Sequence, residues 1–388
     1  MVVQPSVPGA TGQRIPALDV LRGVAVLAVF FHHAAPGTPP DGLLRIPLGV
    51  VHLGWIGVDL FFVLSGFLIT GILLDTRDRP GFFRRFYARR VRRIFPLYYV
   101  TLALIILVLP ILGGAIEREA RVVALEQEWL WTYASNIRIA WLARWDAGYT
   151  AHFWTLAVEE QFYLVWPFVV LLSTPQRLAR TCACIAVLAL VTRCALVLAG
   201  TSPLSLTVFT LTRADTLALG GLLACLLRMP NGVDLVRRLI PRAAWLGGGV
   251  AAVIAAADVA GLVGAWWTGQ GAAWATVGYS ALGVAFTALV AAAALSAPVA
   301  PTGRVLRFLR RTGVYSYGVY VLHAPVLYVL RDAGWRTTDW RVYAAYMATA
   351  FVIVYALAAA SWHGFESRLL RRKSERGLPR PLTALPDS

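Results

Sequence analysis

Apolar stretches of roughly 20 residues recur along the whole sequence, and each is long enough for a helix to cross a lipid bilayer. Hydrophobic residues make up 58% of the chain and its mean hydropathy is +0.65, whereas soluble domains are about half apolar. The sequence therefore predicts an all-α fold, a polytopic transmembrane helical bundle of about ten spans. The expected spans are residues 17–36, 52–74, 94–113, 152–173, 182–199, 208–227, 243–262, 272–295, 314–331 and 342–363.

Arginine residues divide unequally between the two sides of this predicted bundle. One side holds the run from Arg77 to Arg93, several later loops and the C-terminal tail, while the other side holds few arginines. Cytoplasmic loops of membrane proteins carry an excess of Lys and Arg, so we place both termini in the cytoplasm. The same rule accounts for the net charge of +16 without a nucleic-acid partner.

We expect three parts: a short cytoplasmic segment at 1–16, a transmembrane domain at 17–366 and a basic, disordered cytoplasmic tail at 367–388. The first apolar run lacks a signal-peptide pattern and should stay as an anchor. Basic residues are almost all Arg and Ala is frequent, as in GC-rich bacterial genomes. The expected location is the bacterial inner membrane. The four cysteines lack zinc-ligand spacing, so no metal is expected.

The first predicted span carries Arg22 and the pair His32–His33, residues that are costly inside a bilayer and are therefore functional candidates. Arg22 and His33 are eleven residues apart, which on a helix places them on one face, about 16 Å apart along the axis. An imidazole can take a proton from a hydroxyl group near neutral pH, so we interpret His33 as a general base. The alternative is a histidine that only forms hydrogen bonds between helices.

Two adjacent carboxylates, Glu159 and Glu160, stand in the outer half of a later span. The predicted topology puts them at a depth similar to that of His33. A carboxylate beside a histidine can fix its tautomer and stabilise the imidazolium, so one glutamate is expected to orient His33. The alternative is a pair that merely binds Arg213.

A dense run of arginines opens the third span, in the sequence RDRPGFFRRFYARRVRRIFPLYY. Arg90 and Arg93 are three residues apart and share a helix face. Guanidinium groups grip phosphates through paired hydrogen bonds, so the run predicts a phosphate site. The alternative is a topology signal that also binds lipid headgroups.

Several other ionisable residues fall inside predicted spans. Arg213 and Asp215 are interpreted as a structural polar cluster, and Arg193 and Asp258 as residues near span ends whose charged heads reach out of the bilayer. The remaining two residues are Asp59 and His323.

In combination these motifs resemble the membrane-bound acyltransferase family 3, which includes bacterial O-acetyltransferases of polysaccharides. Arg22 and His33 form its pattern of Arg, ten residues and His, and Arg90 and Arg93 form its Arg-x-x-Arg pattern. The resemblance covers about residues 14 to 366, and Thr155 stands where many members have Ser. The other matching segments are GWIGVDLFFVLSGFLIT at 54–70, TLAVEEQFYLVWP at 155–167, TRADTLALGGLLA at 212–224 and YSYGVYVLHAPVL at 315–327.

The resemblance implies an acyltransferase whose donor is cytoplasmic acyl-CoA, with acetyl-CoA as the usual case. Its phosphates would bind Arg22, Arg90 and Arg93, and the thioester would reach His33. The acceptor would be a hydroxyl of a carbohydrate, a cell-surface glycan or a glycosylated metabolite. The catalytic residues implied are His33, Glu159 and Glu160; those lining or supporting the substrate site are Asp59, Arg213, Asp215 and His323.

The sequence leaves several alternatives open. Direct transfer to the acceptor competes with a transient acyl group on His33. A transporter that exports a sugar or an acylated product would also explain many spans with buried charges. The acceptor, the acyl length and the oligomeric state are not specified by any motif.

Overall fold

The computed structural model of the chain describes residues 15–35, 50–259, 271–297, 302–335 and 340–368. Every regular element in these residues is a helix, so the predicted all-α fold is confirmed. Nine of the described helices are long and apolar enough to cross a membrane. The helix α8 (Trp154–Leu171) occupies the place of a further expected span but is not among these nine, and it carries the polar run from Glu159 to Gln161.

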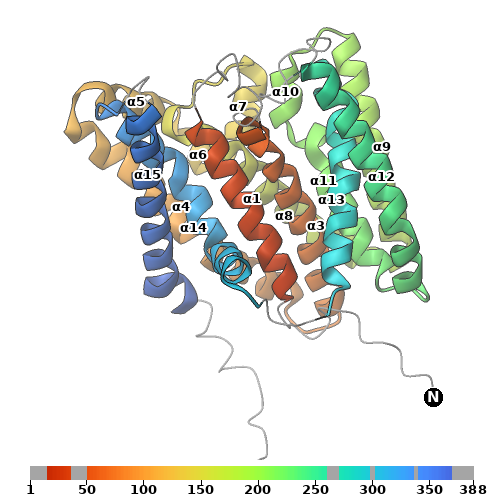
Figure 1. Ribbon diagram of the computed structural model, residues 1–388. Coiled ribbons are helices and arrows are strands. Elements are labelled where there is room, and N and C mark those ends of the chain that lie inside the picture. Colours follow the sequence, from red (N-terminus) through yellow and green to blue (C-terminus); the bar gives the residue numbers. More distant parts are fainter. Residues whose placement is uncertain (1–14, 36–49, 260–270, 298–301, 336–339, 369–388) are drawn as a thin grey trace, which may run out of the picture.

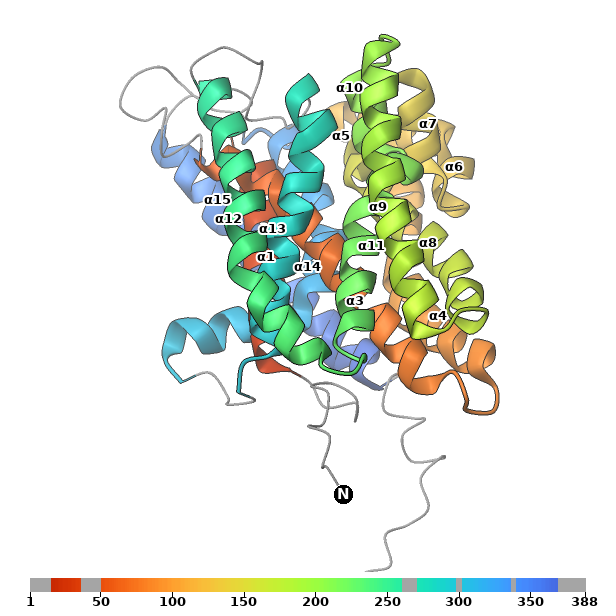
Figure 2. The ribbon, with the colours of Figure 1, turned by 90° about the vertical axis from the view of Figure 1, so that its right-hand side faces the viewer.

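The helices form one bundle, seen from two sides in Figures 1 and 2. Residues 1–14 and 369–388, and the side chain of Asp258, lie outside the described residues. The longer helices besides α8 are α1 (Pro16–Ala34), α3 (Gly57–Thr76), α4 (Phe82–Ala103), α9 (Pro175–Leu198), α11 (Thr210–Leu226), α12 (Gly232–Val259), α13 (Tyr279–Ala294), α14 (Arg304–Asp332) and α15 (Trp340–Ser361).

The start of α1 and the end of α15 lie at the same end of the bundle, the lower end in Figure 1.

Short helices connect the longer ones. The short elements are η1 (Leu53–Ile56), η2 (Leu104–Val108), η3 (Leu109–Leu112), α5 (Gly114–Leu125), α6 (Gln127–Trp131), α7 (Ser135–Leu142), η4 (Gly148–Phe153), α10 (Pro203–Val208), η5 (Trp274–Gly278) and η6 (Trp362–Glu366).

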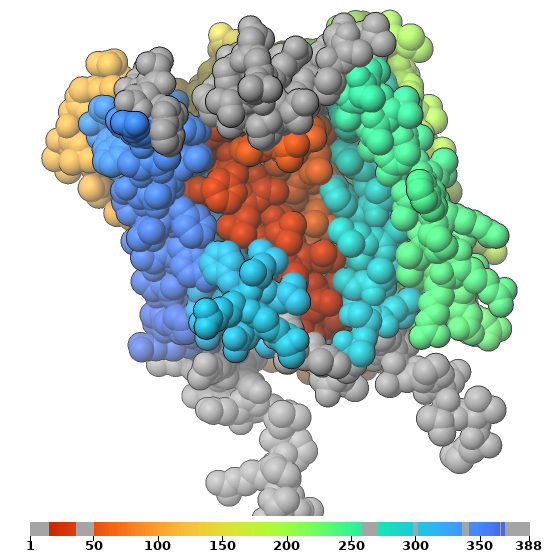
Figure 3. Space-filling view, viewed as in Figure 1, coloured from red at the N-terminus to blue at the C-terminus, as the bar shows by residue number. Residues whose placement is uncertain are grey.

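Helix α1 lies near the middle of the bundle, between α14 and α13 in the view of Figure 1. Part of it reaches the surface, as the space-filling view in Figure 3 shows. Two of its apolar side chains, Val24 and Phe31, are exposed. Its contact with α14 is close because two glycines face the partner helix. A Cβ atom on Gly23 would collide with the Leu309 carbonyl, and one on Gly313 with the Asp19 carbonyl. The glycines therefore set the distance between the helices that carry Arg22 and His323.

Helices α3 and α11 approach each other in the same way. A Cβ atom on Gly66 would overlap the carbonyl of Leu217, and one on Gly220 would overlap the carbonyl of Val63. Without side chains at these points, the two backbones pack directly against each other. The two glycine contacts lie within one turn near the middle of α3.

The arginine-rich run is helical rather than a loop. Helix α4 starts at Phe82 and continues through Pro96, so Arg90 and Arg93 lie inside it. The sequence prediction, which started this span at residue 94, was too short because it treated charged residues as loop. A helix can carry them at a membrane surface when their long side chains reach polar surroundings.

Candidate functional site

A cavity of about 370 Å³ lies between α1, α3, α4, α8 and α14. It extends along α3 from Asp75, near the end of that helix, to Val58, near its start. Three arginines that the sequence predicted as a phosphate site, Arg22, Arg90 and Arg93, line it together. The structure thus brings together residues from the first and third predicted spans.

These three guanidinium groups form no ion pair with any residue that the structure describes. Within the part of the chain that the structure describes, no carboxylate oxygen lies within salt-bridge distance of Arg22, Arg90 or Arg93. Arg90 instead packs over the ring of Tyr163, 5.2 Å from its centroid. Removing a cation from water is costly unless an anion compensates it. The cavity wall is therefore suited to an anionic ligand.

Other partly or fully buried arginines do have carboxylate partners, which sets the cavity cluster apart. Arg228 binds Asp75, a cavity-lining residue, through two hydrogen bonds of 2.8 and 2.7 Å. This pair neutralises the aspartate at one end of the cavity. Four arginines, Arg22, Arg89, Arg90 and Arg93, thus face the carboxylates of Asp19 and Glu159 in the cavity, and its wall keeps a net positive charge.

Glu159 also lines the cavity, but its neighbours differ from those expected. It lies beside Arg22 and Arg90 and near Ser65 and Tyr163, whose hydroxyls share a short hydrogen bond. Glu160, the next residue, does not line the cavity, and its buried Oε1 has no hydrogen-bond partner among the described residues. The adjacent carboxylates point to different surroundings because neighbours on a helix are about 100° apart.

Five of the six histidines gather near the far end of α1. The ring centroids of His33 and His323 are 4.9 Å apart, and those of His323 and His152 are 4.7 Å apart. His32 lies 5.1 Å from His33 and 6.3 Å from His52. Among the described residues, no group of three or more His, Cys, Asp or Glu side chains has a geometry that could hold a metal ion.

Main-chain carbonyls fix the tautomers of these rings. His33 Nδ1 lies 3.0 Å from the Val29 oxygen, and His323 Nδ1 lies 2.6 Å from the Tyr320 oxygen. Because a carbonyl oxygen only accepts, each Nδ1 must carry the hydrogen in the neutral ring. His33 Nε2 is then the nitrogen with the lone pair, and it is the atom that could accept a proton.

The predicted hydrogen bond between His33 and a glutamate is absent from the described residues. His33 Nδ1 instead faces the Val29 carbonyl and His323 Nε2, at 3.0 and 3.3 Å. Glu159 instead lies beside Arg90 and Arg22, and Arg22 precedes His33 by eleven residues on α1. The expectation that a glutamate orients His33 therefore has no hydrogen bond to support it among the described residues.

Two hydroxyl groups lie between the arginines and the histidines. Thr155 and Tyr320 line the cavity, and their hydroxyl oxygens are 2.5 Å apart. Each hydroxyl also lies 3.1 Å from the carbonyl oxygen of His152. Tyr320 and His152 were not among the predicted site residues. The sequence offered one signal for His152: it stands three and seven residues before Thr155 and Glu159, a spacing that puts the three side chains on one helix face.

The remaining predicted site residues form buried ion pairs. Arg213 binds Asp59 at 2.6 Å, and Arg193 binds Asp215 at 2.6 Å, with all four side chains at most 2% exposed. None of these residues lines the cavity. The prediction that Arg193 reaches out of the bilayer was wrong, because it has a carboxylate partner inside the bundle. His323, also fully buried, joins the histidine group instead.

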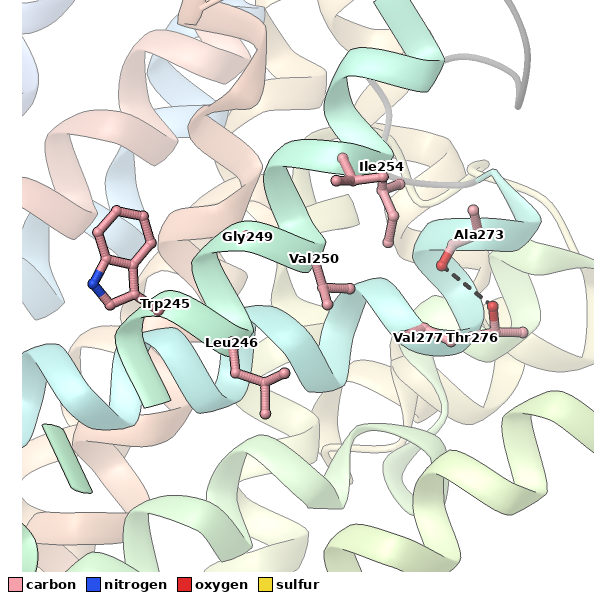
Figure 4. A pocket seen from close by; sticks show the side chains of 9 residues that line it. Trp245, Leu246, Gly249, Val250, Ile254, Ala273, Thr276 and Val277 are labelled. Atoms are coloured by element: carbon pink, nitrogen blue, oxygen red, sulfur yellow. Dashed lines mark hydrogen bonds between the residues drawn. The ribbon is translucent and has the colours of Figure 1, made fainter. Parts of the chain in front are cut away.

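A second hollow, of about 560 Å³, lies between α12 and the η5–α13 segment. Figure 4 shows its apolar walls, which include Trp245, Leu246 and Val250. The polar side chains that line this hollow are the indole of Trp245 and the hydroxyl of Thr276. The Thr276 hydroxyl donates a hydrogen bond to the Ala273 carbonyl at 3.2 Å. This surface offers no group for acid–base chemistry.

Comparison with known proteins agrees with the resemblance seen in the sequence. The peptidoglycan O-acetyltransferase OatA of Listeria monocytogenes is 28% identical over 81% of this chain and 49% of its own length. The O-acetyltransferase OatA of Staphylococcus aureus is 31% identical over 40% of this chain and 24% of its own length. The matched part of the chain thus spans about half or less of the length of these curated relatives. No solved structure matches it.

The family comparison covers far more of the chain. A family model described as an acyltransferase domain matches residues 15–359, which include every residue that lines the cavity except Trp362. The arginine cavity, the hydroxyl pair and the histidine group therefore all lie within, or at the edge of, the matched region. The chain belongs to this acyltransferase family and is a multi-pass membrane member of it.

Proposed function

We propose that the chain is an integral membrane O-acyltransferase that moves an acyl group, most simply acetyl, from acyl-CoA to a hydroxyl of a carbohydrate. One observation carries this proposal: a cavity lined by four arginines, none of which has a salt-bridge partner among the described residues, leads to a hydroxyl pair that contacts the histidine group. Coenzyme A has phosphates at one end and a thioester at the other. The arginine end of the cavity would bind the phosphates, and the end with the hydroxyl pair would receive the thioester.

The donor would bind with its phosphates on Arg22, Arg90 and Arg93, because guanidinium groups form charge-assisted hydrogen bonds with phosphate oxygens. The arm of the donor would follow α3 towards Thr155 and Tyr320. Acyl-CoA is made in the cytoplasm, so the arginine end of the cavity would face that side of a bacterial inner membrane. This assignment agrees with the excess of arginines that the sequence places there.

The reaction needs a base for the acceptor hydroxyl, and His33 Nε2 fits that task. It would take the hydroxyl proton as the oxygen attacks the thioester carbonyl, and the thiolate of coenzyme A would leave. An acyl group carried briefly on His33 Nε2 is the alternative route. Glu159 would act at the donor end, where it lies beside Arg22 and Arg90.

The acceptor is proposed to be a cell-wall glycan or a similar glycosylated molecule. Both relatives are named as O-acetyltransferases, and the name of the Listeria protein specifies peptidoglycan. A hydroxyl on such a sugar would approach His33 from the end of the bundle opposite to the arginines. Asp59 and Arg213 would support the site by joining α3 to α11, and Asp215 would do so by joining α11 to α9 through Arg193.

Binding of coenzyme A tests the donor site directly. Replacing Arg90 and Arg93 with Gln should weaken binding at least ten-fold, since each hydrogen bond to a charged group contributes about 1.5–3 kcal/mol. The matched control replaces Arg84 and Arg85, exposed arginines on the same helix that do not line the cavity. Calorimetric titration of the purified protein would measure both affinities, and equal losses in the two variants would contradict the proposal.

His33→Gln tests the chemical step separately. This variant should bind coenzyme A normally and lose acyl transfer to a glycan acceptor, measured with radiolabelled acetyl-CoA. Full activity in His33→Gln would remove the imidazole from the mechanism. A transporter would instead move a sugar across liposomes without acyl-CoA, and wild-type protein that does so and transfers no acyl group would favour that function.

A further inference from the structure

We propose that His323 is a positioning residue that holds His33 in its reactive orientation, the task expected of a glutamate. This inference rests on the proposed function of His33. His323 Nε2 lies 3.3 Å from His33 Nδ1, and the two rings come from α14 and α1. The contact joins two helices whose spacing is fixed by Gly23 and Gly313.

The direction of this hydrogen bond follows from the carbonyl groups around it. His323 donates its Nδ1 hydrogen to the Tyr320 oxygen at 2.6 Å, which leaves a lone pair on Nε2. His33 carries its hydrogen on Nδ1, because that atom also faces the Val29 oxygen. His33 is therefore the donor and His323 the acceptor, and both rings are neutral.

Val29 by itself is a weak partner for the ring. It lies four residues before His33 in α1, so its carbonyl already accepts the main-chain N–H of His33 within the helix. His323 Nε2 accepts no other hydrogen bond in the described residues. It therefore supplies the second acceptor and fixes the rotation of the His33 ring about its side-chain bonds.

This arrangement matters most when His33 is protonated. As His33 Nε2 takes the hydroxyl proton, the ring gains a positive charge and its Nδ1–H becomes a stronger donor. A neutral acceptor at 3.3 Å stabilises that cation. In the Ser-His-Asp triad a carboxylate does this, and here a second imidazole occupies the equivalent place. No described carboxylate lies within hydrogen-bond distance of His33.

His323 is held rigidly, as a positioning residue must be. Its side chain is fully buried, and its ring lies 4.7 Å from that of His152 and 5.4 Å from that of Tyr320. Tyr320 thus contributes twice: its carbonyl sets the His323 tautomer and its hydroxyl contacts Thr155 in the cavity. The donor cavity and the His33 ring are linked through one turn of α14.

Nuclear magnetic resonance of the resting protein tests the geometry without any substrate. With ¹⁵N-labelled histidine, the chain gives signals from only six rings. We expect His33 to carry its proton on Nδ1 and to show a scalar coupling across the hydrogen bond to His323 Nε2. A His33 ring protonated on Nε2, or one without this coupling, would overturn the inference.

Kinetics of two His323 variants test the role. His323→Leu removes the acceptor and should lower kcat at least ten-fold with the KM for acetyl-CoA unchanged. His323→Gln offers a side-chain oxygen to the His33 Nδ1–H and should recover much of the rate. The matched control is His363→Gln, which alters the exposed histidine that lies outside this group and bonds the Tyr315 hydroxyl. Its kcat should stay near that of the wild type.

The outcomes separate this inference from the proposed function. Absence of acyl transfer by the wild-type protein would contradict the proposed function, while the resonance experiment still reports the ring geometry. Normal transfer by a folded His323→Leu variant would overturn this inference alone. Equal losses in His323→Leu and His323→Gln, with donor binding intact, would also overturn it, because rescue by the amide would have failed.

Discussion

The hydroxyl oxygens of Thr155 and Tyr320 lie 2.5 Å apart at the point where the arginine-lined cavity meets the histidine group. Each also lies 3.1 Å from the carbonyl oxygen of His152. Two hydroxyl hydrogens thus serve three contacts, so one hydroxyl donates to the other and the second donates to the carbonyl. The pair comes from α8 and α14 and joins these helices next to the site.

We expect Thr155→Val and Tyr320→Phe to destabilise the protein by about 1 kcal/mol each, the usual net value of a hydrogen bond. The double variant should lose less than the sum, because both substitutions remove the same shared bond. Thermal unfolding in detergent, followed for all three variants, would measure this coupling. Thr155→Ser keeps the hydroxyl and should unfold like the wild type. Strictly additive losses would show that the two groups do not share a bond.

Arg228 is expected to affect donor binding although it does not line the cavity. It neutralises Asp75, which does. Arg228→Gln would leave a negative charge beside the donor site and weaken coenzyme A binding several-fold, more at low salt than at high salt. Adding Asp75→Asn should restore the affinity. Calorimetry at two salt concentrations measures both effects, and failure of the second substitution to restore binding would contradict the electrostatic explanation.

The buried pair of Asp59 and Arg213 is expected to act on stability rather than on binding. Asp59→Ala leaves an unpaired guanidinium inside the bundle, which costs about 3–5 kcal/mol. Glu117→Ala, which breaks the exposed pair with Arg121, should cost about 0–1 kcal/mol. The fraction of folded protein and its unfolding temperature would report both losses. An Asp59→Ala protein that is stable but cannot bind coenzyme A would instead place Asp59 in the donor site.

Gly66 is expected to tolerate no side chain. A Cβ atom there would overlap the Leu217 carbonyl of α11, so Gly66→Ala should separate the helices and cost at least about 1–3 kcal/mol. Gly248→Ala is the matched control, because no atom lies within 4 Å of its added Cβ. That substitution should be neutral or stabilise α12 by about 0.5–1 kcal/mol. Similar unfolding temperatures for the two variants would contradict the close α3–α11 contact.

Helix positions and charge patterns in the sequence located much of the candidate site. The Arg22 and Arg90–Arg93 patterns predicted a group of cations, and the structure brings them to one cavity wall. This succeeded because fixed helical spacing places residues on a face, and because unpaired charge inside an apolar run is costly enough to be informative. The same logic singled out His33 as a candidate but could not show which group faces it.

The amino-acid sequence by itself determined the helical, membrane-spanning architecture, since long apolar runs leave a chain few other ways to satisfy its backbone in lipid. Only the tertiary structure decided the pairing of side chains across helices. It assigned Glu159 to the arginines, Arg193 to Asp215 and His323 to His33. These partners depend on helix rotation and depth, which contacts such as Gly23 against Leu309 set and which no residue spacing within one helix encodes.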